Sequence, residues 1–149
     1  MFTIGSFAVI FDSENRILLC HRRDIDAWNL PGGVVESGEL PTEAVIRETL
    51  EETGLNIEIE RLAGIYGKAD KDEFVFSFVA RVVGGKIGST DEADECIYFS
   101  LDKFPENTLS KHVERVEDAI KHSEVIYREQ SGKTTMDLLK DLGLEGQAV

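Results

Sequence analysis

The chain has 149 residues, of which 42% are hydrophobic and 30% are charged, and its formal net charge at pH 7 is −13. This length and composition predict one domain, residues 1–149, that is large enough to bury a core of its own. The acidic charge argues against a nucleic-acid polymer as partner, because such binding depends on Lys and Arg that neutralise phosphates. A small phosphorylated substrate carried with a metal ion is still allowed.

The two cysteines, Cys20 and Cys96, are too few for a disulfide framework and lack metal-ligand spacing. We therefore expect two reduced, mostly buried thiols. The N-terminus has no basic segment followed by a long apolar run, and no stretch approaches the ~18 apolar residues of a membrane span. The sequence thus predicts a cytoplasmic protein without a membrane contact.

The first elements form a predicted hairpin. Residues 3–11 and 17–22 are rich in strand-forming side chains and flank the turn cluster of residues 12–16. Arg22 and Arg23 follow the second strand. Their guanidinium groups match phosphate oxygens well, although basic residues are also common at strand ends for structural reasons.

A loop of residues 24–29 carries Trp28, which we expect to pack in the core rather than to hold a nucleobase. Gly32 and Gly33 come next, and paired glycines let the backbone approach a ligand closely.

A helix is predicted from Pro41 to Thr53, because proline suits the first turn and Gly54 suits the left-handed residue after the last turn. Helical spacing groups one set of residues on a face that we expect to meet the core: Val45, Ile46, Thr49, Leu50 and Thr53. Glu48, Glu51 and Glu52 fall on the other side.

These three carboxylates converge on one patch and repel one another, so we expect another interaction to offset this repulsion. Hard cations such as Mg²⁺ take oxygen ligands and bind substrate phosphates at the same time. The alternative is a solvated acidic helix face without a ligand.

The second half of the chain continues with strands at residues 57–65 and 73–83, joined by a turn at 68–72. Phe74, Phe76 and Phe78 share one face of the second strand, which predicts core packing. A short strand is expected at 96–99. A helix is expected at about 109–122, with Val113, Val116 and Ile120 at core spacing.

His112 and His122 are expected at the surface of that helix, because nothing pairs them with another ligand. A strand at residues 125–129, a short helix at 135–142 and a loose tail complete the prediction.

One motif joins these features. The spacing is that of the Nudix box, filled without a gap by Gly33, Glu39, Arg47, Glu48, Glu51, Glu52, Gly54 and Leu55. Such a match arises by chance less than about once in a million. Only Thr49 departs, at a position where the pattern has a hydrophobic residue that the threonine methyl can replace. The chain therefore resembles the Nudix hydrolase family of MutT-like proteins.

The resemblance implies an α/β Nudix fold, with a mixed β-sheet sandwiched between α-helices. It also implies hydrolysis of a nucleoside diphosphate linked to another moiety, with Mg²⁺ as cofactor and Mn²⁺ as a substitute. The implied metal ligands are Glu48, Glu51, Glu52, the carbonyl of Gly32 and an additional Glu92. Glu92 stands six residues before Tyr98, as in many relatives. Glu95 is its competitor, and a solvated acidic loop is the alternative reading.

The other roles follow from the same resemblance. The general base is one of the glutamates, with Glu52 or Glu51 favoured. Arg47 is expected to orient carboxylates, including that of Glu39, through charge-assisted hydrogen bonds. Arg22 or Arg23 would contact substrate phosphates.

Two other functions are weighed against the enzyme. A non-catalytic Nudix-like nucleotide sensor would be expected to have lost a glutamate of the box, and an isomerase on this fold would need further cysteine and glutamate positions. The substrate stays open among nucleotides and nucleotide sugars. Relatives of the ADP-ribose type carry a proline after the box, and this chain has none between Leu55 and Pro105, which argues against that type. Dimers are common among relatives, so a homodimer is open as well.

Overall fold

The structure, a computed structural model, describes residues 1–131 and 135–143. Its helices are α1 (Pro41–Thr53), α2 (Ser110–Lys121) and α3 (Thr135–Asp141), with short 3₁₀ turns at Ala69–Lys71 and Leu101–Lys103. The strands are β1 (Thr3–Ile10), β2 (Ile17–Arg22), β3 (Trp28–Asn29), β4 (Gly32–Val34), β5 (Leu55–Lys68), β6 (Glu73–Gly85), β7 (Ala93–Phe99) and β8 (Ile126–Glu129).

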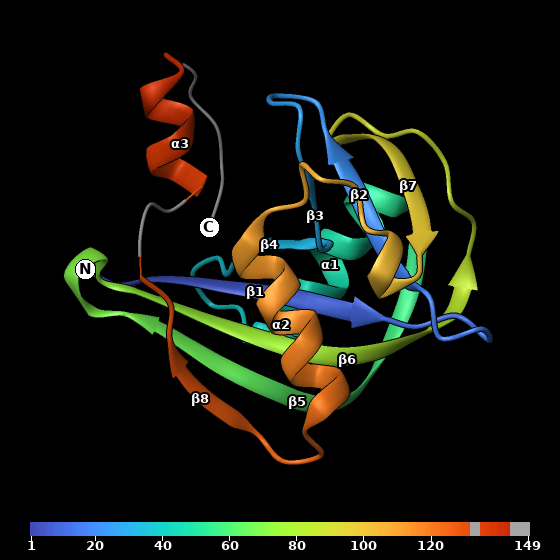
Figure 1. The fold of residues 1–149 in the computed structure, drawn as a ribbon, viewed down its shortest axis with the longest axis horizontal. Coiled ribbons are helices and arrows are strands. Elements are labelled where there is room, and N and C mark those ends of the chain that lie inside the picture. Colours follow the sequence, from blue (N-terminus) through green and yellow to red (C-terminus); the bar gives the residue numbers. More distant parts are fainter. Residues whose placement is uncertain (132–134, 144–149) are drawn as a thin grey trace.

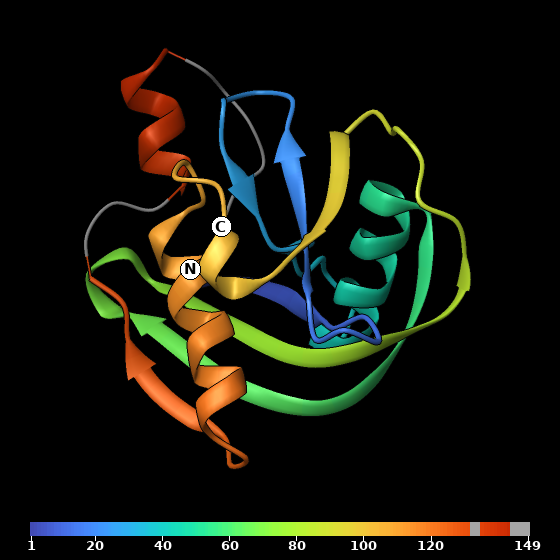
Figure 2. The same cartoon turned by 45° about the vertical axis from the view of Figure 1, so that its right-hand side comes forward.

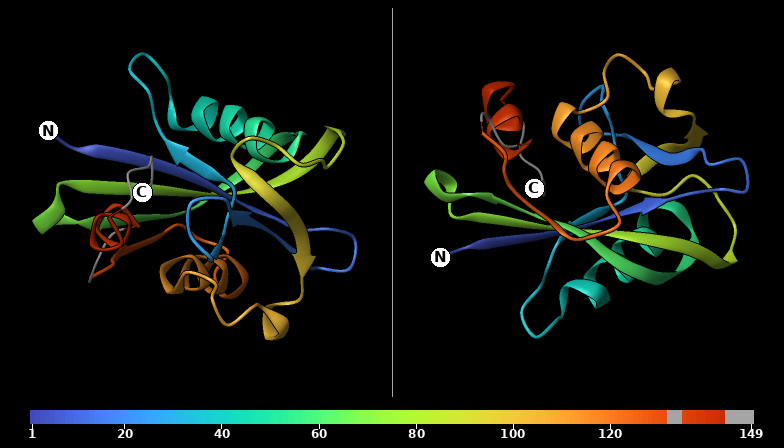
Figure 3. Two further views of the ribbon diagram at one scale, coloured as in Figure 1. Left: turned by 90° about the horizontal axis from the view of Figure 1, so that it is seen from above. Right: turned by 60° about the horizontal axis from the view of Figure 1, so that its bottom comes forward.

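The strands form two sheets. The long sheet has the order β4-β1-β6-β5-β8, and it is mixed, because β1 runs parallel to β6 and β5 parallel to β8 while the other pairs are antiparallel. Helices α1 and α2 cover opposite faces of this sheet (Figures 1 and 3). The small sheet, β3-β2-β7, stands across the long sheet between the two helices (Figure 2). The predicted mixed sheet between helices is confirmed.

The predicted hairpin of the first two strands is wrong. β1 pairs with β4 and β6, β2 pairs with β3 and β7, and a single bridge between Phe11 and Ile17 joins the two strands. Both strands carry continuous buried runs, at residues 5–10 and 17–20. A strand that is buried on both faces needs cover on each of them. Each strand has this cover as an inner strand of a different sheet, β1 in the long sheet and β2 in the small sheet.

The core has two layers, one on each side of the long sheet, and neighbouring residues of a strand alternate between them. The layer towards α2 contains Phe7, Val9, Ile17, Leu19, Leu30, Ala63, Tyr66, Val75, Val79, Val116 and Ala119. The layer towards α1 contains Ala8, Ile10, Leu18, Val45, Leu55, Ile57, Phe78 and Ala80. Phe76 packs against the α1 layer and stacks on Phe78, which confirms core packing for these two residues. Phe74 belongs to neither layer and stacks on the exposed Phe2 at 5.2 Å.

Helix α1 has the predicted bounds, but its buried face is rotated from the prediction. Ile46 and Leu50 are 37% and 45% exposed, whereas Ala44 and Glu48 are buried beside Val45. The helical wheel places large apolar side chains inward and carboxylates outward. The prediction holds for Val45, Thr49 and Thr53, which are buried, and is wrong for Ile46, Leu50 and Glu48. Glu48 is buried because it lies against Gly33 of β4 and accepts a hydrogen bond from Arg47.

Helix α2 also buries polar groups that the prediction places outside. His112 is 2% exposed, its Nδ1 accepts the Leu30 N–H at 3.1 Å, and burial lowers its pKa well below the usual value. Ile120, expected in the core, is 49% exposed, and Ala119 takes the inward position. The expectation of a surface His112 is therefore wrong, because a backbone N–H of a distant loop supplies its partner.

Most of the remaining elements agree with the prediction, but the predicted loop of residues 24–29 ends in the short strand β3 and the predicted glycine-rich turn forms β4. Trp28 packs edge-to-face on Phe99 at 5.3 Å, Cys20 and Cys96 are free thiols, and β8 and α3 lie at the expected residues. The predicted tail after Leu142 falls mostly outside the described residues. No helix in the described ranges is long and apolar enough to cross a membrane.

Candidate active site

Helix α1 is anchored at both ends. The Ser6 hydroxyl of β1 donates to the Pro41 carbonyl at 2.6 Å, and the Glu43 carboxylate accepts the Leu40 N–H at 3.0 Å. At the other end Gly54 adopts φ 82° and its N–H donates to Leu50. A left-handed residue of this kind ends a helix most easily when it is glycine. These contacts fix the height and rotation of the glutamates on α1.

Glu48 lies directly against β4. A Cβ atom built on Gly33 would stand 2.7 Å from Cδ of Glu48 and 2.9 Å from its Oε1. Glycine is therefore required at position 33 for the carboxylate to occupy this place. Burial and the nearby charge of Glu92 raise the pKa of Glu48 to about 7.

Arg47 connects the carboxylates around it. Its Nε and Nη2 donate to the two oxygens of Glu39 at 2.7 and 3.0 Å, while Nη1 donates to Glu48 at 3.0 Å and to Glu51 at 3.3 Å. Nη2 also donates to the Val34 carbonyl at 3.3 Å. One guanidinium thus holds three acidic side chains in a fixed arrangement.

Glu39 is the most firmly ionised member of this group. The Arg47 guanidinium and the Glu36 N–H lower the pKa of Glu39 to about 2. Its two hydrogen bonds from Arg47 make it an anchor for that guanidinium, the contact that the sequence predicts.

Three carboxylates converge. Glu48, Glu51 and Glu92 each place an oxygen within 4.8 Å of the others, and Glu51 and Glu92 are exposed to solvent. Partial burial and the charge of Glu51 raise the pKa of Glu92. An all-oxygen donor set with crowded negative charge suits a hard divalent cation. Glu95, the competitor of Glu92, is exposed and lies opposite His21 in the small sheet, outside this group.

Glu52 lies next to the three. Its Oε2 accepts the Gly32 N–H at 3.3 Å. Burial and the charge of Glu48 raise the pKa of Glu52 well above its usual value. Gly32 has φ 151°, and a Cβ there would collide with the Ser6 carbonyl and with Phe7. The paired glycines therefore bring the β4 backbone against the glutamates of α1.

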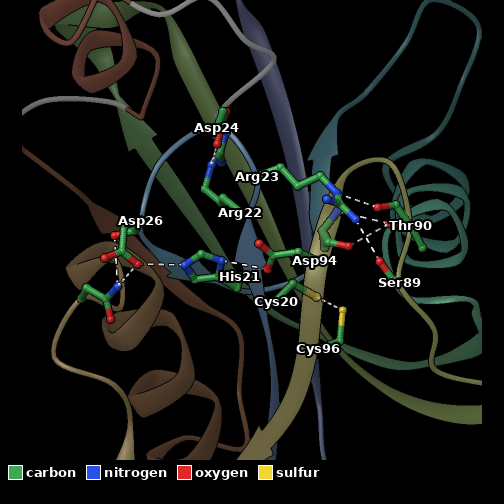
Figure 4. A network of polar contacts seen from close by, with 12 residues as sticks. Cys20, His21, Arg22, Arg23, Asp24, Asp26, Ser89, Thr90, Asp94 and Cys96 are labelled. Atoms are coloured by element: carbon green, nitrogen blue, oxygen red, sulfur yellow. Dashed lines mark hydrogen bonds and ion pairs between the residues drawn. The ribbon is translucent and has the colours of Figure 1, made fainter.

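The loop that carries Glu92 is tied to α1 and β2 by contacts that the sequence does not predict. The Thr90 hydroxyl donates to the Glu52 carbonyl at 2.9 Å. Arg23 donates to the Thr90 carbonyl at 2.7 Å and to the Ser89 hydroxyl at 2.9 Å (Figure 4). A single threonine or serine in a loop carries no motif, so spacing alone gives no signal for this link.

Arg22 is held differently from Arg23. Its Nε and Nη2 donate to the two Asp24 oxygens at 2.7 and 2.6 Å (Figure 4). Both arginines predicted to contact phosphate thus have partners within the protein. Neither joins the group of glutamates.

The mixed α/β fold brings carboxylates of α1 and of the loop before β7 together in a group that could hold a hard divalent cation. A family model described as the NUDIX domain matches residues 1–120. The chain belongs to the Nudix family.

Relatives in this family carry names of pyrophosphatases. A Methanocaldococcus jannaschii protein named ADP-ribose pyrophosphatase is 40% identical over 103 residues, which are 64% of this chain and 61% of that protein. A Bacillus subtilis protein, provisionally named as an 8-oxo-dGTP diphosphatase, is 37% identical over 86 residues, 58% of either chain. The matches thus span about three fifths of these relatives.

The fold is shared with solved structures as well. The crystal structure of an ADP-ribose pyrophosphatase from Streptococcus suis matches with a TM-score of 0.72 and 24% identity, covering 87% of this chain and all of the other. At this identity the likeness concerns the fold.

Proposed function

We propose that the protein is a divalent-metal-dependent pyrophosphohydrolase that acts on a small nucleotide-type substrate, a nucleoside diphosphate linked to another moiety. The observation that carries the proposal is the convergence of Glu48, Glu51 and Glu92 within 4.8 Å beside the glycines of β4. The names of the relatives, which refer to pyrophosphate bonds, support it.

The chain offers groups for both metal binding and proton transfer. Glu48, Glu51 and Glu92, with Glu52 and the Gly32 carbonyl as additional candidates, would hold Mg²⁺ or Mn²⁺. Such an ion screens the charge of the pyrophosphate and lowers the pKa of a bound water.

We assign the general base to Glu52, because its carboxylate lies beside the three converging oxygens rather than among them. Arg47 would keep Glu39, Glu48 and Glu51 in place during turnover. A phosphate contact by Arg22 or Arg23 would require exchange of the bonds that these residues make with Asp24 or with the Ser89–Thr90 segment.

Replacing Glu52 tests the site. Glu52→Gln keeps the shape and the Gly32 hydrogen bond but removes the proton acceptor. We expect turnover with Mg²⁺ to fall by about 10²–10⁴-fold. The matched control is Glu60→Gln, a change of one exposed carboxylate on β5. Turnover measured over a panel of nucleotides would also identify the substrate.

Turnover is compared between Glu52→Gln and Glu60→Gln after circular dichroism spectra and thermal midpoints have shown that both variants are folded alike. Full activity of Glu52→Gln would contradict the assignment of the base. Absence of Mg²⁺-dependent product release from any nucleotide, with binding retained, would instead favour a nucleotide sensor over an enzyme.

A further inference from the structure

The two cysteines of the chain lie opposite each other on neighbouring strands. Cys20 on β2 pairs in register with Cys96 on β7, and the two strands run antiparallel. Their Sγ atoms are 3.1 Å apart and share a thiol hydrogen bond (Figure 4). The two residues stand 76 positions apart in the sequence, so the tertiary fold alone brings these thiols together. Neither thiol takes part in the proposed hydrolysis.

The backbone geometry of this pair suits a disulfide. Residues that face each other across antiparallel strands have Cα atoms ~4.5–5.5 Å apart, within the range of ~4.4–6.8 Å that a disulfide needs. From their separation of 3.1 Å the sulfur atoms have to approach by ~1 Å to reach the ~2.0 Å of a covalent bond. Rotation of the two side chains can supply this movement. The strands can therefore keep their register.

The two thiols differ in their access to solvent. Cys20 is buried, whereas Cys96 is partly exposed on the outer strand of the small sheet. A small oxidant therefore reaches Cys96 first, and Cys20 is placed to react with the oxidised sulfur. The chain has two cysteines, so an internal disulfide has a single possible pairing.

We propose that Cys20 and Cys96 are a site of oxidative modification, at which hydrogen peroxide forms a disulfide between β2 and β7. Peroxide oxidises the Cys96 thiol to a sulfenic acid and is itself reduced to water. The Cys20 sulfur then bonds to the Cys96 sulfur, and the sulfenic oxygen leaves with the Cys20 proton as a second water. Two thiols and one peroxide thus give one disulfide and two waters.

The disulfide fastens a strand that is otherwise held from one side. β7 is the outer strand of the small sheet, and in the described part of the chain it pairs with β2 alone. Its first residue, Ala93, directly follows Glu92 of the candidate metal site. A covalent bond near the middle of the β2–β7 pair limits the separation of the two strands. It thereby also limits the movement of the segment that carries Glu92.

Cys96 also contacts the end of α1, where its Sγ donates to the Glu52 carbonyl at 3.7 Å. The same carbonyl accepts from the Thr90 hydroxyl at 2.9 Å, so it keeps a donor when the thiol hydrogen is lost. The disulfide therefore uses no carboxylate of the candidate site and leaves the link between α1 and the Glu92 segment in place.

Thiol counting and peptide mapping of the full chain test the modification. EDTA is present to exclude metal-catalysed oxidation. After treatment with hydrogen peroxide, we expect the denatured wild-type chain to have lost both reactive thiols and to yield a Cys20–Cys96 linked peptide, and a reductant should restore both thiols. Retained thiols, oxygen added to either cysteine as the main product, or a disulfide between two chains would overturn the proposal.

Stability gives a second readout. In the chain-entropy model, a disulfide that closes a loop of this length should raise the thermal midpoint of a 149-residue protein by about 5–15 °C. We expect such a rise for oxidised wild type, reversed by reductant, together with slower amide hydrogen exchange in β7. A midpoint that is unchanged or lower once the disulfide has formed would contradict the proposed fastening of β7.

A matched control keeps two cysteines but separates them. Successive residues of a strand point to opposite faces, so the 40% exposed Ile97 lies on the face away from Cys20. The double variant Cys96→Ala/Ile97→Cys should therefore form no internal disulfide and show no rise in midpoint after peroxide treatment. If it behaves as wild type, the opposed position of the two thiols is not what decides the reaction.

Cys96→Ala alone is the second variant, and because Cys96 is only partly buried, its replacement leaves the core intact. It should keep the Cys20 thiol through peroxide treatment and show no rise in midpoint. A rise equal to that of wild type would contradict the disulfide as its cause. None of these measurements involves turnover, so this proposal can fail while the proposed hydrolase activity holds.

Discussion

The buried carboxylate of Glu48 can take its position only because residue 33 is a glycine and has no side chain. The carboxylate occupies the space of a Cβ atom at position 33, at 2.7 Å from the place where that atom would stand. Arg47 donates to Oε1 of the same carboxylate at 3.0 Å. Gly33 thus leaves space for the Glu48 carboxylate and Arg47 donates a hydrogen bond to it, which explains why this glycine and this arginine accompany the glutamates in the motif.

Gly33→Ala should consequently displace Glu48 without unfolding the chain. We expect the affinity for Mn²⁺ or Mg²⁺, measured by calorimetry, to fall by about 10–100-fold. Gly88→Ala is the matched control, because a Cβ there meets nothing within 4 Å. An affinity in Gly33→Ala equal to that of the control would contradict the role of this contact.

Helix α1 shows how a polar residue fits a position that the family motif fills with a hydrophobic one. Thr49 is fully buried, and its Oγ1 has no hydrogen-bond partner among the described residues. Four residues on, the Thr53 hydroxyl donates to the Thr49 carbonyl at 2.6 Å and accepts the Leu55 N–H at 3.0 Å. Of the two buried threonines of this helix, the Thr53 hydroxyl is thus hydrogen-bonded, and the Thr49 hydroxyl is not bonded to any described residue.

Replacing each threonine by the similarly shaped valine separates these states. Thr49→Val removes an unsatisfied hydroxyl and should raise the free energy of unfolding by ~1 kcal/mol. Thr53→Val leaves the Leu55 N–H without its acceptor and should lower it by ~1–2 kcal/mol. Urea unfolding of both variants measures the difference. The same sign for both changes would show that hydroxyl satisfaction does not decide their effect.

In the molecule as a whole, acidic groups are concentrated where α1, β4 and the loop before β7 meet. Burial and mutual repulsion raise the pKa values of Glu48, Glu52 and Glu92. Raised carboxylate pKa values mean that the folded chain binds more protons than the unfolded chain above pH ~4.5. Stability of the metal-free protein therefore falls as the pH rises through this window. Glu39, with a pKa of about 2, acts in the opposite direction, and its contribution is lost only at lower pH.

The pH dependence of unfolding in EDTA checks this account. For Glu48 the full shift to about 7 corresponds to ~3 kcal/mol, and solvent screening reduces the expected loss between pH 5 and 8 to ~2 kcal/mol. Glu48→Gln should flatten the profile, and Mg²⁺ should restore stability to wild type at pH 8 but not to the variant. An identical slope in wild type and Glu48→Gln would contradict the shift.

The sequence by itself determined the features that rest on local chemistry. The bounds of α1 follow from Pro41 and Gly54, and the regular spacing along the helix brings Glu48, Glu51 and Glu52 to one region. The strands β5, β6 and β8 follow from runs of strand-forming residues. Fixed spacing in a motif also identifies the family before any contact is known, because caps and helical periodicity act over a few residues.

Only the tertiary structure decided which partners these elements have. It separated β1 from β2, turned Glu48 inward, buried His112 against Leu30, and linked Thr90 to Glu52. Each of these contacts joins residues far apart in the chain. Their formation depends on how whole faces pack and on which buried polar groups satisfy one another, which no local pattern records.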